Sequence, residues 1–287
     1  MTDRARLIDG LAHYADAFAA RDPRSLRLAP GAIFTENGQR LDFGQAAWRT
    51  VSDVGPCYAS FVDPATGQAA AYHRIEENGQ AAVLMLRIAM DGDLIAGVET
   101  IVCRNRPFLF APDNMARHSP ILRPVAPAAR ADRATLAAIP DAYFDGIVAD
   151  DAQSIPVSPD CIRVECGEPC TACPPSEERA AARGFDLYAM SVAEQIDSRF
   201  FAICTGIEER RVLVDEEQSI ALAIARFDFD GSVLEYEMPG IGRRATEPYY
   251  LVPRSILIAE AFQMVDGLVR SIETVWESCP FGMRSGW

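Results

Sequence analysis

The chain has 287 residues, of which 49% are hydrophobic and 24% are charged, and its formal net charge is −14 at pH 7. This acidic balance argues against a nucleic-acid-binding protein and against attraction to anionic membranes, because both need a basic surface. No apolar run is long enough to span a bilayer, and the first residues form an amphipathic pattern instead of a signal peptide. We therefore expect a cytoplasmic protein with neither a nucleic-acid nor a membrane partner.

The chain contains an internal repeat. A shift of 129 positions aligns Asp3–Leu7 with Asp132–Leu136, and it pairs several further residues: Tyr14 with Tyr143, Asp16 with Asp145, Asp22 with Asp151, Ser25 with Ser154, Pro30 with Pro159, Glu36 with Glu165 and Gly38 with Gly167. Near the ends of the copies, Leu94–Val102 matches Leu268–Trp276 at a shift of 174. The second copy has therefore gained 45 residues, which we place near 166–184 and 230–248.

Each copy shows the same order of predicted elements. Apolar residues at helical spacing between Leu7 and Phe18 predict an amphipathic helix. A short strand at Ile33–Glu36 and a helix at Gly44–Thr50 follow. An Asp-Gly pair then marks a hairpin turn between the last two of four strand-like runs, which are Cys57–Val62, Ala69–Ile75, Ala81–Met90 and Leu94–Arg104.

These elements predict an α+β protein with two tandem units, in which a long helix crosses a curved antiparallel sheet and leaves a conical cavity. The first unit would comprise residues 1–105 and the second 131–287, with a Pro-rich linker at 106–130. Pro140 should kink the first helix of the second unit. The order of elements resembles the nuclear transport factor 2-like superfamily, which includes ketosteroid isomerases, scytalone dehydratases and polyketide cyclases. This architectural likeness supports the fold more than the function.

Arg87 and Glu99 stand among apolar residues on the two strands of the predicted hairpin, where burial would require them to pair. A three-residue loop would make them diagonal neighbours on one face, whereas a two-residue loop would put them on opposite faces. An intermediate shift of 139 makes Arg226 the counterpart of Arg87, and Glu273 is that of Glu99. The pair is either a charged lining of the cavity or a scaffold ion pair present in both units.

His73 lies in the middle of a predicted strand, and the same intermediate shift places Val212 there in the second copy. The fold therefore does not need a histidine, and His73 is a candidate for proton transfer near neutral pH, or else a hydrogen-bonded strand residue. Tyr14 and Tyr143 lie on the apolar faces of the long helices. Each is either a hydrogen-bond donor to a substrate oxygen or a core tyrosine.

Glu36 is retained as Glu165, which suits a structural role, while Asn37 changes to Cys166 and is the more variable contact. The chain has eight cysteines, but no secretory signal favours disulfides. Three of them have the spacing of radical S-adenosylmethionine iron–sulfur motifs, although antiparallel hairpins do not fit the parallel barrel of those enzymes. A zinc site with a fourth cysteine is the alternative to unliganded loop thiols, and the four residues concerned are Cys161, Cys166, Cys170 and Cys173. We predict neither a metal nor a cofactor.

Several segments resemble one bacterial and fungal family of tandem polyketide cyclase-like proteins. These segments are Phe34–Gly38, Ala142–Asp145, Cys161–Glu165, Val214–Glu217 and Pro280–Trp287. Together with the Ala-rich, acidic composition, this resemblance implies a relationship to sphingomonad γ-formaldehyde lyases of lignin catabolism, which act without a cofactor on diarylpropane-type dimers. In that reaction, loss of the benzylic hydroxyl gives a quinone methide, and the terminal hydroxymethyl group leaves as formaldehyde to yield a stilbene.

Such chemistry needs an acid, a base and hydrogen-bond donors for a phenolate. We assign His73 or Glu99 as the base, Tyr14 as the donor and Arg87 as the phenolate partner. The residues expected to contact the small aromatic substrate are Glu36, Asn37, Trp48, Tyr58, Tyr143 and Arg226. Two alternatives stay open: another cofactor-free isomerase, dehydratase or cyclase, or a non-catalytic binder of aromatic metabolites in which the second copy is a dimer-like partner. We also expect a homo-oligomer.

Overall fold

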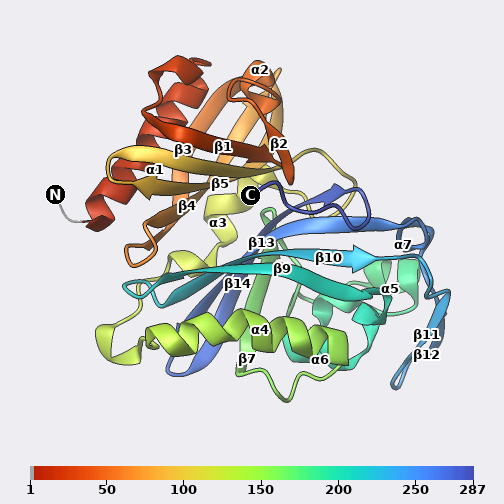
Figure 1. Ribbon diagram of the computed structural model, residues 1–287. Helices are drawn as coiled ribbons and strands as arrows, with labels where there is room; N and C mark the ends of the chain where they lie inside the picture. Colours follow the sequence, from red (N-terminus) through yellow and green to blue (C-terminus); the bar gives the residue numbers. More distant parts are fainter. Residues whose placement is uncertain (1–2) are drawn as a thin grey trace.

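The computed structural model describes residues 3–287, apart from the side chains of residues 116, 118 and 120. It shows a mixed α+β architecture with two six-stranded, curved sheets (Figure 1). The strand order is β2-β1-β6-β5-β4-β3 in one sheet and β8-β7-β14-β13-β10-β9 in the other. In each sheet one neighbouring pair is parallel, β1 with β6 and β7 with β14, and the other pairs are antiparallel. The two units therefore share one topology.

The first unit begins with helix α1 and ends with strand β6. Its elements are α1 (Asp3–Ala19), β1 (Leu28–Glu36), β2 (Gln39–Leu41), α2 (Ala47–Thr50), β3 (Val51–Asp63), β4 (Gln68–Glu77), β5 (Gln80–Asp91) and β6 (Leu94–Cys103). A connecting segment with the short helix α3 (Met115–His118) leads to the second unit.

The second unit begins with helix α4 and ends with strand β14. Its elements are α4 (Arg133–Ala149), β7 (Val157–Glu165), β8 (Glu168–Pro169), α5 (Glu177–Arg183), α6 (Val192–Asp197), β9 (Gly206–Asp215), β10 (Ile220–Phe229), β11 (Glu235–Met238), β12 (Gly242–Ala245), α7 (Pro248–Leu251), β13 (Arg254–Val265) and β14 (Leu268–Cys279). Strands β11 and β12 form a separate hairpin.

The strand positions show how the two copies align. Strands β1 and β7 are 129 positions apart, β4 and β10 are 152 apart, and both β5 and β6 are 174 from their counterparts. The second unit therefore has two extra segments. Extra segment 1 lies between β8 and β9 and contains α5 and α6, and extra segment 2 lies between β10 and β13 and contains β11, β12 and α7.

This alignment corrects the intermediate shift of 139 that the sequence suggested. Arg226 is the counterpart of Arg74, because both lie at the same place in the matching strands β10 and β4. Ala261 lies opposite Glu273, where the first unit has Arg87 opposite Glu99. By the same alignment His73 corresponds to Ala225, not to Val212. The ion pair of the first unit is therefore not repeated in the second.

The hairpin between β5 and β6 also differs from both sequence alternatives. Asp91 pairs with Leu94, so the loop has two residues. A bulge then shifts the register between Ala89 and Met90, and this extra residue places Arg87 directly opposite Glu99 on one face. The pair thus forms in a register that neither simple loop would produce.

Helix α4 runs from Arg133 to Ala149 without a break at Pro140, the residue where the sequence predicted a kink. Its start is capped by Asp132, whose side chain accepts a hydrogen bond from the Thr135 amide at 2.8 Å. Proline removes one backbone hydrogen bond from the helix. Buried residues on both sides, Ile139 and Tyr143 among them, hold the helix against the sheet and offset that loss.

The two sheets pack against each other through the faces that do not carry the long helices, so α1 and α4 lie on the outside (Figure 1). At this junction the Tyr72 hydroxyl of the first unit donates to the Ala259 carbonyl at 3.0 Å and lies 3.3 Å from the Glu273 carbonyl. The C-terminal segment 280–287 returns from β14 to the first unit, where the Trp287 ring lies 4.0 Å from the Arg87 guanidinium. No helix in the described part of the chain has the length and apolar content to cross a bilayer.

Candidate functional site

A cavity of about 130 Å³ lies in the second unit between α4, the sheet and extra segment 1. Its walls are mostly aromatic and aliphatic, and they include Phe200, Phe201, Phe227, Phe229, Ile256 and Ile258. Charged and polar side chains gather at its other end, namely Tyr143, Arg163, Glu165, Cys170 and Glu260. A small, largely apolar cavity with a few converging polar groups is the usual form of a binding site for a small molecule.

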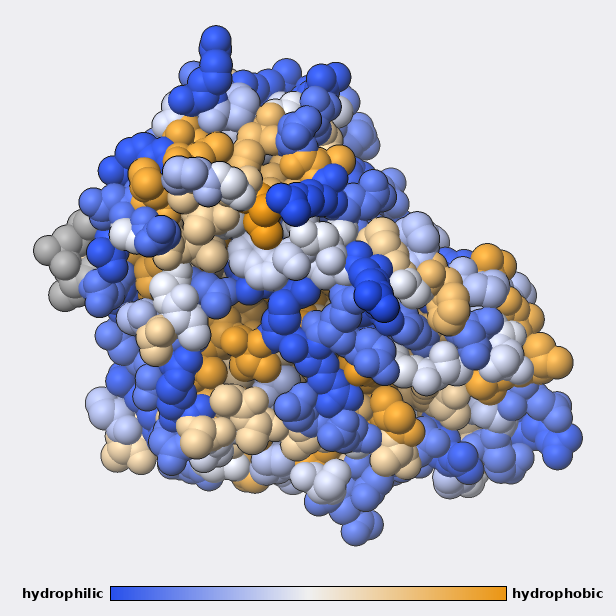
Figure 2. Space-filling model, viewed as in Figure 1, coloured by the Kyte–Doolittle hydropathy of each residue, from blue (hydrophilic) through white to orange (hydrophobic). Residues whose placement is uncertain are grey.

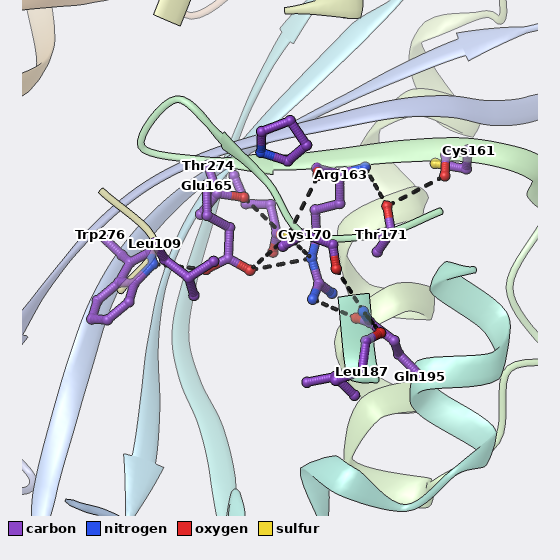
Figure 3. Close-up of polar contacts among 12 residues, drawn as sticks. Leu109, Cys161, Arg163, Glu165, Cys170, Thr171, Leu187, Gln195, Thr274 and Trp276 are labelled. Carbon is purple, nitrogen blue, oxygen red and sulfur yellow. Dashed lines mark hydrogen bonds and ion pairs between the residues drawn. The ribbon is translucent and has the colours of Figure 1, made fainter. Parts of the chain in front are cut away.

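Arg163 is the centre of the polar end of the cavity (Figure 3). It projects from β7 and is 5% exposed. Its guanidinium donates to the Tyr143 hydroxyl at 2.9 Å and to the Gln195 side-chain oxygen at 2.7 Å, and its Nε lies 3.2 Å from Glu165 Oε1. Because α4, α6 and β7 each supply one of these groups, the fold itself fixes the orientation of the arginine.

Glu165 is held from the opposite side by Trp276, whose indole nitrogen donates to Glu165 Oε2 at 2.8 Å (Figure 3). The guanidinium of Arg106, from the connecting segment, covers the Trp276 ring, with its carbon 3.4 Å from the ring centroid. Arg106 also donates to the Cys166 sulfur at 3.1 Å. Both oxygens of Glu165 thus have partners, which suits a residue that positions Arg163.

Glu260 is the second carboxyl of the cavity, and its neighbours along strand β13, from Ile256 to Phe262, are apolar. Its Oε1 accepts a hydrogen bond from the Thr274 hydroxyl at 3.1 Å, and the residue is 3% exposed. Burial raises the pKa of Glu260 to about 8, against the opposing effect of Arg163. The side chain is therefore mostly a neutral acid at pH 7, with a pKa close enough to neutrality for proton transfer.

The two extra segments form the mouth of the cavity. Extra segment 1 supplies Arg183, and extra segment 2 supplies Glu247. These residues form an ion pair at 2.9 Å, and both are partly exposed. Figure 2 shows hydrophobic residues gathered at the edge of the molecule near α7, and three exposed apolar side chains belong to extra segment 2 or its flank: Leu234, Leu251 and Val252. The mouth therefore has no counterpart in the first unit.

In the first unit the corresponding space is filled with side chains. Trp48 packs edge-on against Tyr14 and Phe18, with ring centroids 5.4 and 5.2 Å apart. Its indole nitrogen donates to the Tyr14 hydroxyl at 3.1 Å. Burial raises the pKa of Tyr14, and all three rings are almost completely buried.

Two polar residues of the cavity, Arg163 and Glu260, have apolar counterparts in the first unit. Phe34 occupies the position of Arg163, and Leu86 that of Glu260, in matching registers of the two sheets. The first unit is therefore packed as a core, and the second unit carries the cavity. One alternative from the sequence made the second copy only a dimer-like partner of the first. The cavity instead lies in the second copy.

Arg87 and Glu99 lie at the junction between the sheets and not in a cavity of the first unit. Arg87 donates to Glu99 at 2.6 Å, and Arg211 of the second unit donates to the other Glu99 oxygen at 2.7 Å. Trp287 covers the Arg87 guanidinium. These contacts suit the scaffold interpretation of the pair, since Arg211 and Trp287 tie it to the second unit and the C-terminal segment.

His73 is separated from this ion pair. Its Nδ1 lies 3.0 Å from the Gly55 carbonyl oxygen, and burial lowers its pKa, which the hydrogen bond to Gly55 partly offsets. Asn37 accepts a hydrogen bond from the Val102 amide at 2.8 Å, and Glu36 accepts one from the Ala47 amide at 3.0 Å. The structure thus gives each of these predicted site residues a local partner in the first unit.

Of the remaining predicted contacts, Tyr143 alone lines the cavity of the second unit. Tyr58 lies at the junction, where its hydroxyl is 3.7 Å from the Met115 sulfur. Arg226 pairs with Asp228 at 2.9 Å and donates to the Met283 carbonyl at 3.3 Å, so it holds the C-terminal segment.

The four clustered cysteines have different partners. Cys166 accepts from Arg106, the Cys170 sulfur lies 3.3 Å from the Arg163 Nε, and the Cys173 sulfur donates to the Pro169 carbonyl at 3.4 Å. The Cys161 carbonyl accepts from Thr171 at 3.5 Å. Within the described residues, no group of three or more potential ligands is arranged to hold a metal ion.

Neither Arg163 nor Glu260 was among the site residues predicted from the sequence, although the sequence carries a signal for both. At the shifts of 129 and 174 that the repeat already gave, the first copy has Phe34 and Leu86 at these positions. A charge that replaces an apolar residue inside a strand is costly unless it is paired or functional.

The fold and the cavity define an α+β protein with two sheet units, one of them packed solid and the other hollow. A family model described as "Domain of unknown function (DUF8021)" matches residues 129–276, more than half of the chain, and the chain belongs to this family. The matched region is the second unit up to Trp276 in β14, so it contains the cavity.

The comparison with curated proteins found no match. Among solved structures, the chain is similar to a putative ketosteroid isomerase from Kribbella flavida (13% identity, 42% of this chain and 94% of that chain, TM-score 0.32). It is also similar to a steroid delta-isomerase from Pseudomonas aeruginosa (18% identity, 36% and 82%, TM-score 0.28) and to a de novo designed protein with a curved β-sheet (14% identity, 36% and 88%, TM-score 0.30). At these scores the similarities carry no conclusion about function.

Proposed function

We propose that the protein is a cofactor-independent acid–base enzyme that acts on a small aromatic compound in the cavity of the second unit. The observation that carries this proposal is the position of Glu260, a buried carboxyl that faces an aromatic cavity together with Arg163 and Tyr143. The packed first unit has apolar residues, Phe34 and Leu86, at the positions of Arg163 and Glu260. The charges of the second unit are thus not a requirement of the fold, and catalysis is a reason to retain them.

The three groups can divide the work of proton transfer. Glu260 is largely protonated at pH 7, so it can donate a proton to a departing or carbonyl oxygen and then take one back as a carboxylate. The Tyr143 oxygen accepts from Arg163, which leaves the phenol hydrogen free to bond a substrate oxygen. Arg163 supplies positive charge where an oxyanion develops. Similar division of roles serves isomerases, dehydratases and lyases.

The finer form of the proposal is the formaldehyde-releasing lyase. A diarylpropane substrate would bind as its phenolate beside Arg163. Glu260 protonates the benzylic hydroxyl, the carbon–oxygen bond breaks, and water and a quinone methide form. The Glu260 carboxylate then takes the proton of the terminal alcohol, the carbon–carbon bond breaks, and its electron pair restores the phenolate as formaldehyde and a stilbene are released. The cavity holds about one ring, so the second ring of such a substrate would occupy the mouth.

The test is turnover of a diarylpropane-1,3-diol and of single-ring phenolic ketones, measured as formaldehyde, as stilbene absorbance and as deuterium uptake next to the carbonyl. Glu260→Gln should reduce any such activity about 10²–10⁴-fold, because it removes the proton but keeps the shape. The matched control is Glu273→Gln, since Glu273 is also buried in a strand, with its pKa raised to about 7 by burial, but it faces the junction. Equal loss in both variants, or full activity of Glu260→Gln, would refute the assignment. Aromatic binding without any turnover would favour the non-catalytic binder.

A further inference from the structure

The polar end of the cavity has more hydrogen-bond donors than acceptors. Arg163 has five N–H donors. One donates to the Tyr143 hydroxyl and one to the Gln195 side-chain oxygen, and the Nε–H lies against Glu165 and the Cys170 sulfur. Two N–H groups of the guanidinium thus have no hydrogen-bond partner among the described residues. The Tyr143 hydroxyl adds a third hydrogen and the protonated Glu260 a fourth.

The acceptors that could satisfy these donors are already engaged. Glu165 accepts from Arg163 through one oxygen and from Trp276 through the other. The Gln195 amide nitrogen is turned away, and it donates to the Cys170 and Leu187 carbonyls at 2.6 and 2.8 Å. A buried donor without an acceptor costs free energy, so the polar end is complementary to a ligand that brings acceptors only.

We propose that the cavity recognises a single aromatic ring bearing an anionic oxygen group, a carboxylate or a phenolate, which Arg163, Tyr143 and Glu260 bind together. This inference rests on the proposed function, because it names the substrate class of the same site. A carboxylate or phenolate is an acceptor without a donor, and a guanidinium binds it through parallel N–H groups.

The size and walls of the cavity agree with one ring. Its volume of about 130 Å³ is close to that of the engineered apolar cavity of about 150 Å³ that holds benzene. Phe227 and Phe229 from β10 and Ile256 and Ile258 from β13 form an apolar wall on one side. The ring would lie against this wall and its anionic group would point to Arg163.

Binding of such an anion should be coupled to the protonation of Glu260. The titratable and charged groups around Glu260 are Tyr143 on α4, Arg163 and Glu165 on β7, Cys170 after β8, and Arg183, Tyr188, Glu247 and Tyr250 at the mouth. The anion prefers the neutral acid, which donates to it, and is repelled by the carboxylate. Affinity should therefore be highest below the pKa of Glu260 and should fall as the pH rises above it.

The experiment is isothermal titration calorimetry of the full chain with benzoate, phenol and benzyl alcohol as probes, near pH 7 and near pH 9. At pH 7 we expect benzoate or phenol to bind at least about tenfold more tightly than benzyl alcohol, since only an anion uses the charge of Arg163. Phenol that binds as phenolate must release a proton, so its heat of binding will change with the ionisation enthalpy of the buffer. This readout distinguishes the phenolate from the carboxylate source.

Two variants and a control decide the outcome. Glu260→Gln keeps a neutral donor, and it should retain benzoate binding while abolishing the fall in affinity between pH 7 and pH 9. Arg163→Gln should remove the preference for the anion, and Arg163→Lys, which keeps the charge, should restore part of it if the first variant is unstable. Arg211→Gln, at an arginine of the second unit that pairs with Glu99 at the junction and does not line the cavity, should leave binding unchanged.

The proposal is overturned if benzyl alcohol binds as well as both anions, or if the pH dependence persists in Glu260→Gln. These outcomes do not depend on turnover. Tight, pH-coupled binding of benzoate without any reaction would leave the inference intact and would sink the proposed enzyme. Turnover of neutral compounds without a preference for anions would support the proposed enzyme and would refute the inference about the anionic ligand.

Discussion

Asp63 and Asp215 make the same contacts in opposite directions across the junction of the two units. Asp63 ends β3 and accepts from Arg133 at the start of α4 at 2.8 and 2.9 Å. Asp215 ends β9 and accepts from Arg4 in α1, with both contacts at 2.9 Å. Each carboxylate also accepts a backbone N–H from the other unit. The two units are therefore related like the subunits of a symmetric dimer joined in one chain.

These two aspartates should be important for stability. Both are fully buried, and burial alone would raise the pKa of Asp63, but hydrogen bonds from Arg133 and Val214 outweigh it and lower the pKa. Asp63→Asn and Asp215→Asn should each lower the free energy of unfolding by about 2 kcal/mol, because each puts an amide donor among donors. Urea denaturation measures this loss. Asp160→Asn is the control, since its ion pair with Arg270 is exposed and should contribute little to stability. Equal stability of all three variants would contradict a stabilising role for Asp63 and Asp215.

The repeat explains how much of the fold the sequence could reveal. The matching long helices and the strands β1, β7, β6 and β14 follow from residue identities at two fixed shifts. The middle of each unit could not be aligned in this way, because extra segment 1 interrupts the second copy and few identities remain there. Arg226 was therefore matched to Arg87, although strand pairing places it at Arg74.

The position of the site was harder to infer for two physical reasons. In the strands of both units, one face meets a helix and the other meets the partner sheet, and an apolar sequence pattern does not distinguish these faces. Arg87 and Glu99 therefore looked like cavity residues, although they lie at the junction. In addition, nine of the 21 lining residues come from the extra segments, which have no counterpart, and Phe200 and Tyr250 are examples. Their placement depends on tertiary packing that periodicity does not encode.

Trp48 tests whether the first unit is a core. Its side chain is 2% exposed and fills the space between Tyr14 and Phe18. Trp48→Ala should lower the free energy of unfolding by about 4 kcal/mol, the usual cost of removing a buried tryptophan. Ligand binding in the second unit should not change at temperatures where the variant is folded. A loss of binding with only a small loss of stability would instead place the ligand in the first unit.

The Arg183–Glu247 ion pair should control access to the cavity. Because both side chains are partly exposed, Glu247→Gln should change the free energy of unfolding by less than about 1 kcal/mol. Release of a bound aromatic compound should nevertheless become several-fold faster, since the two extra segments would no longer be held together at the mouth. Stopped-flow fluorescence of Trp276, which lines the cavity, can follow this release. Glu235→Gln, in the exposed pair with Arg243 on the β11–β12 hairpin, is the matched control and should leave release unchanged.

Glu260 should make the protein less stable as the pH rises from about 5 to about 8. Its pKa is about 8 in the folded protein, above the ordinary value of 4.5 that applies to the unfolded chain. Below the lower value both states bind the proton, so the residue has no effect on stability. Between the two values the unfolded chain loses the proton while the folded protein keeps it. Unfolding is then favoured increasingly with pH, by an amount on the order of a few kcal/mol.

Glu260→Gln removes this proton and should flatten the decline, so that the variant gains stability relative to the native chain at pH 8 but not at pH 4. Denaturant unfolding at a series of pH values measures the difference. Glu273→Gln should flatten the curve as well, because burial raises the pKa of Glu273 to about 7. The two variants should therefore resemble each other in stability and differ in catalysis, since only Glu260 faces the cavity. A native chain whose stability does not fall between pH 5 and pH 8 would show that neither carboxyl keeps its proton, and the proton donor of the proposed reaction would be lost with it.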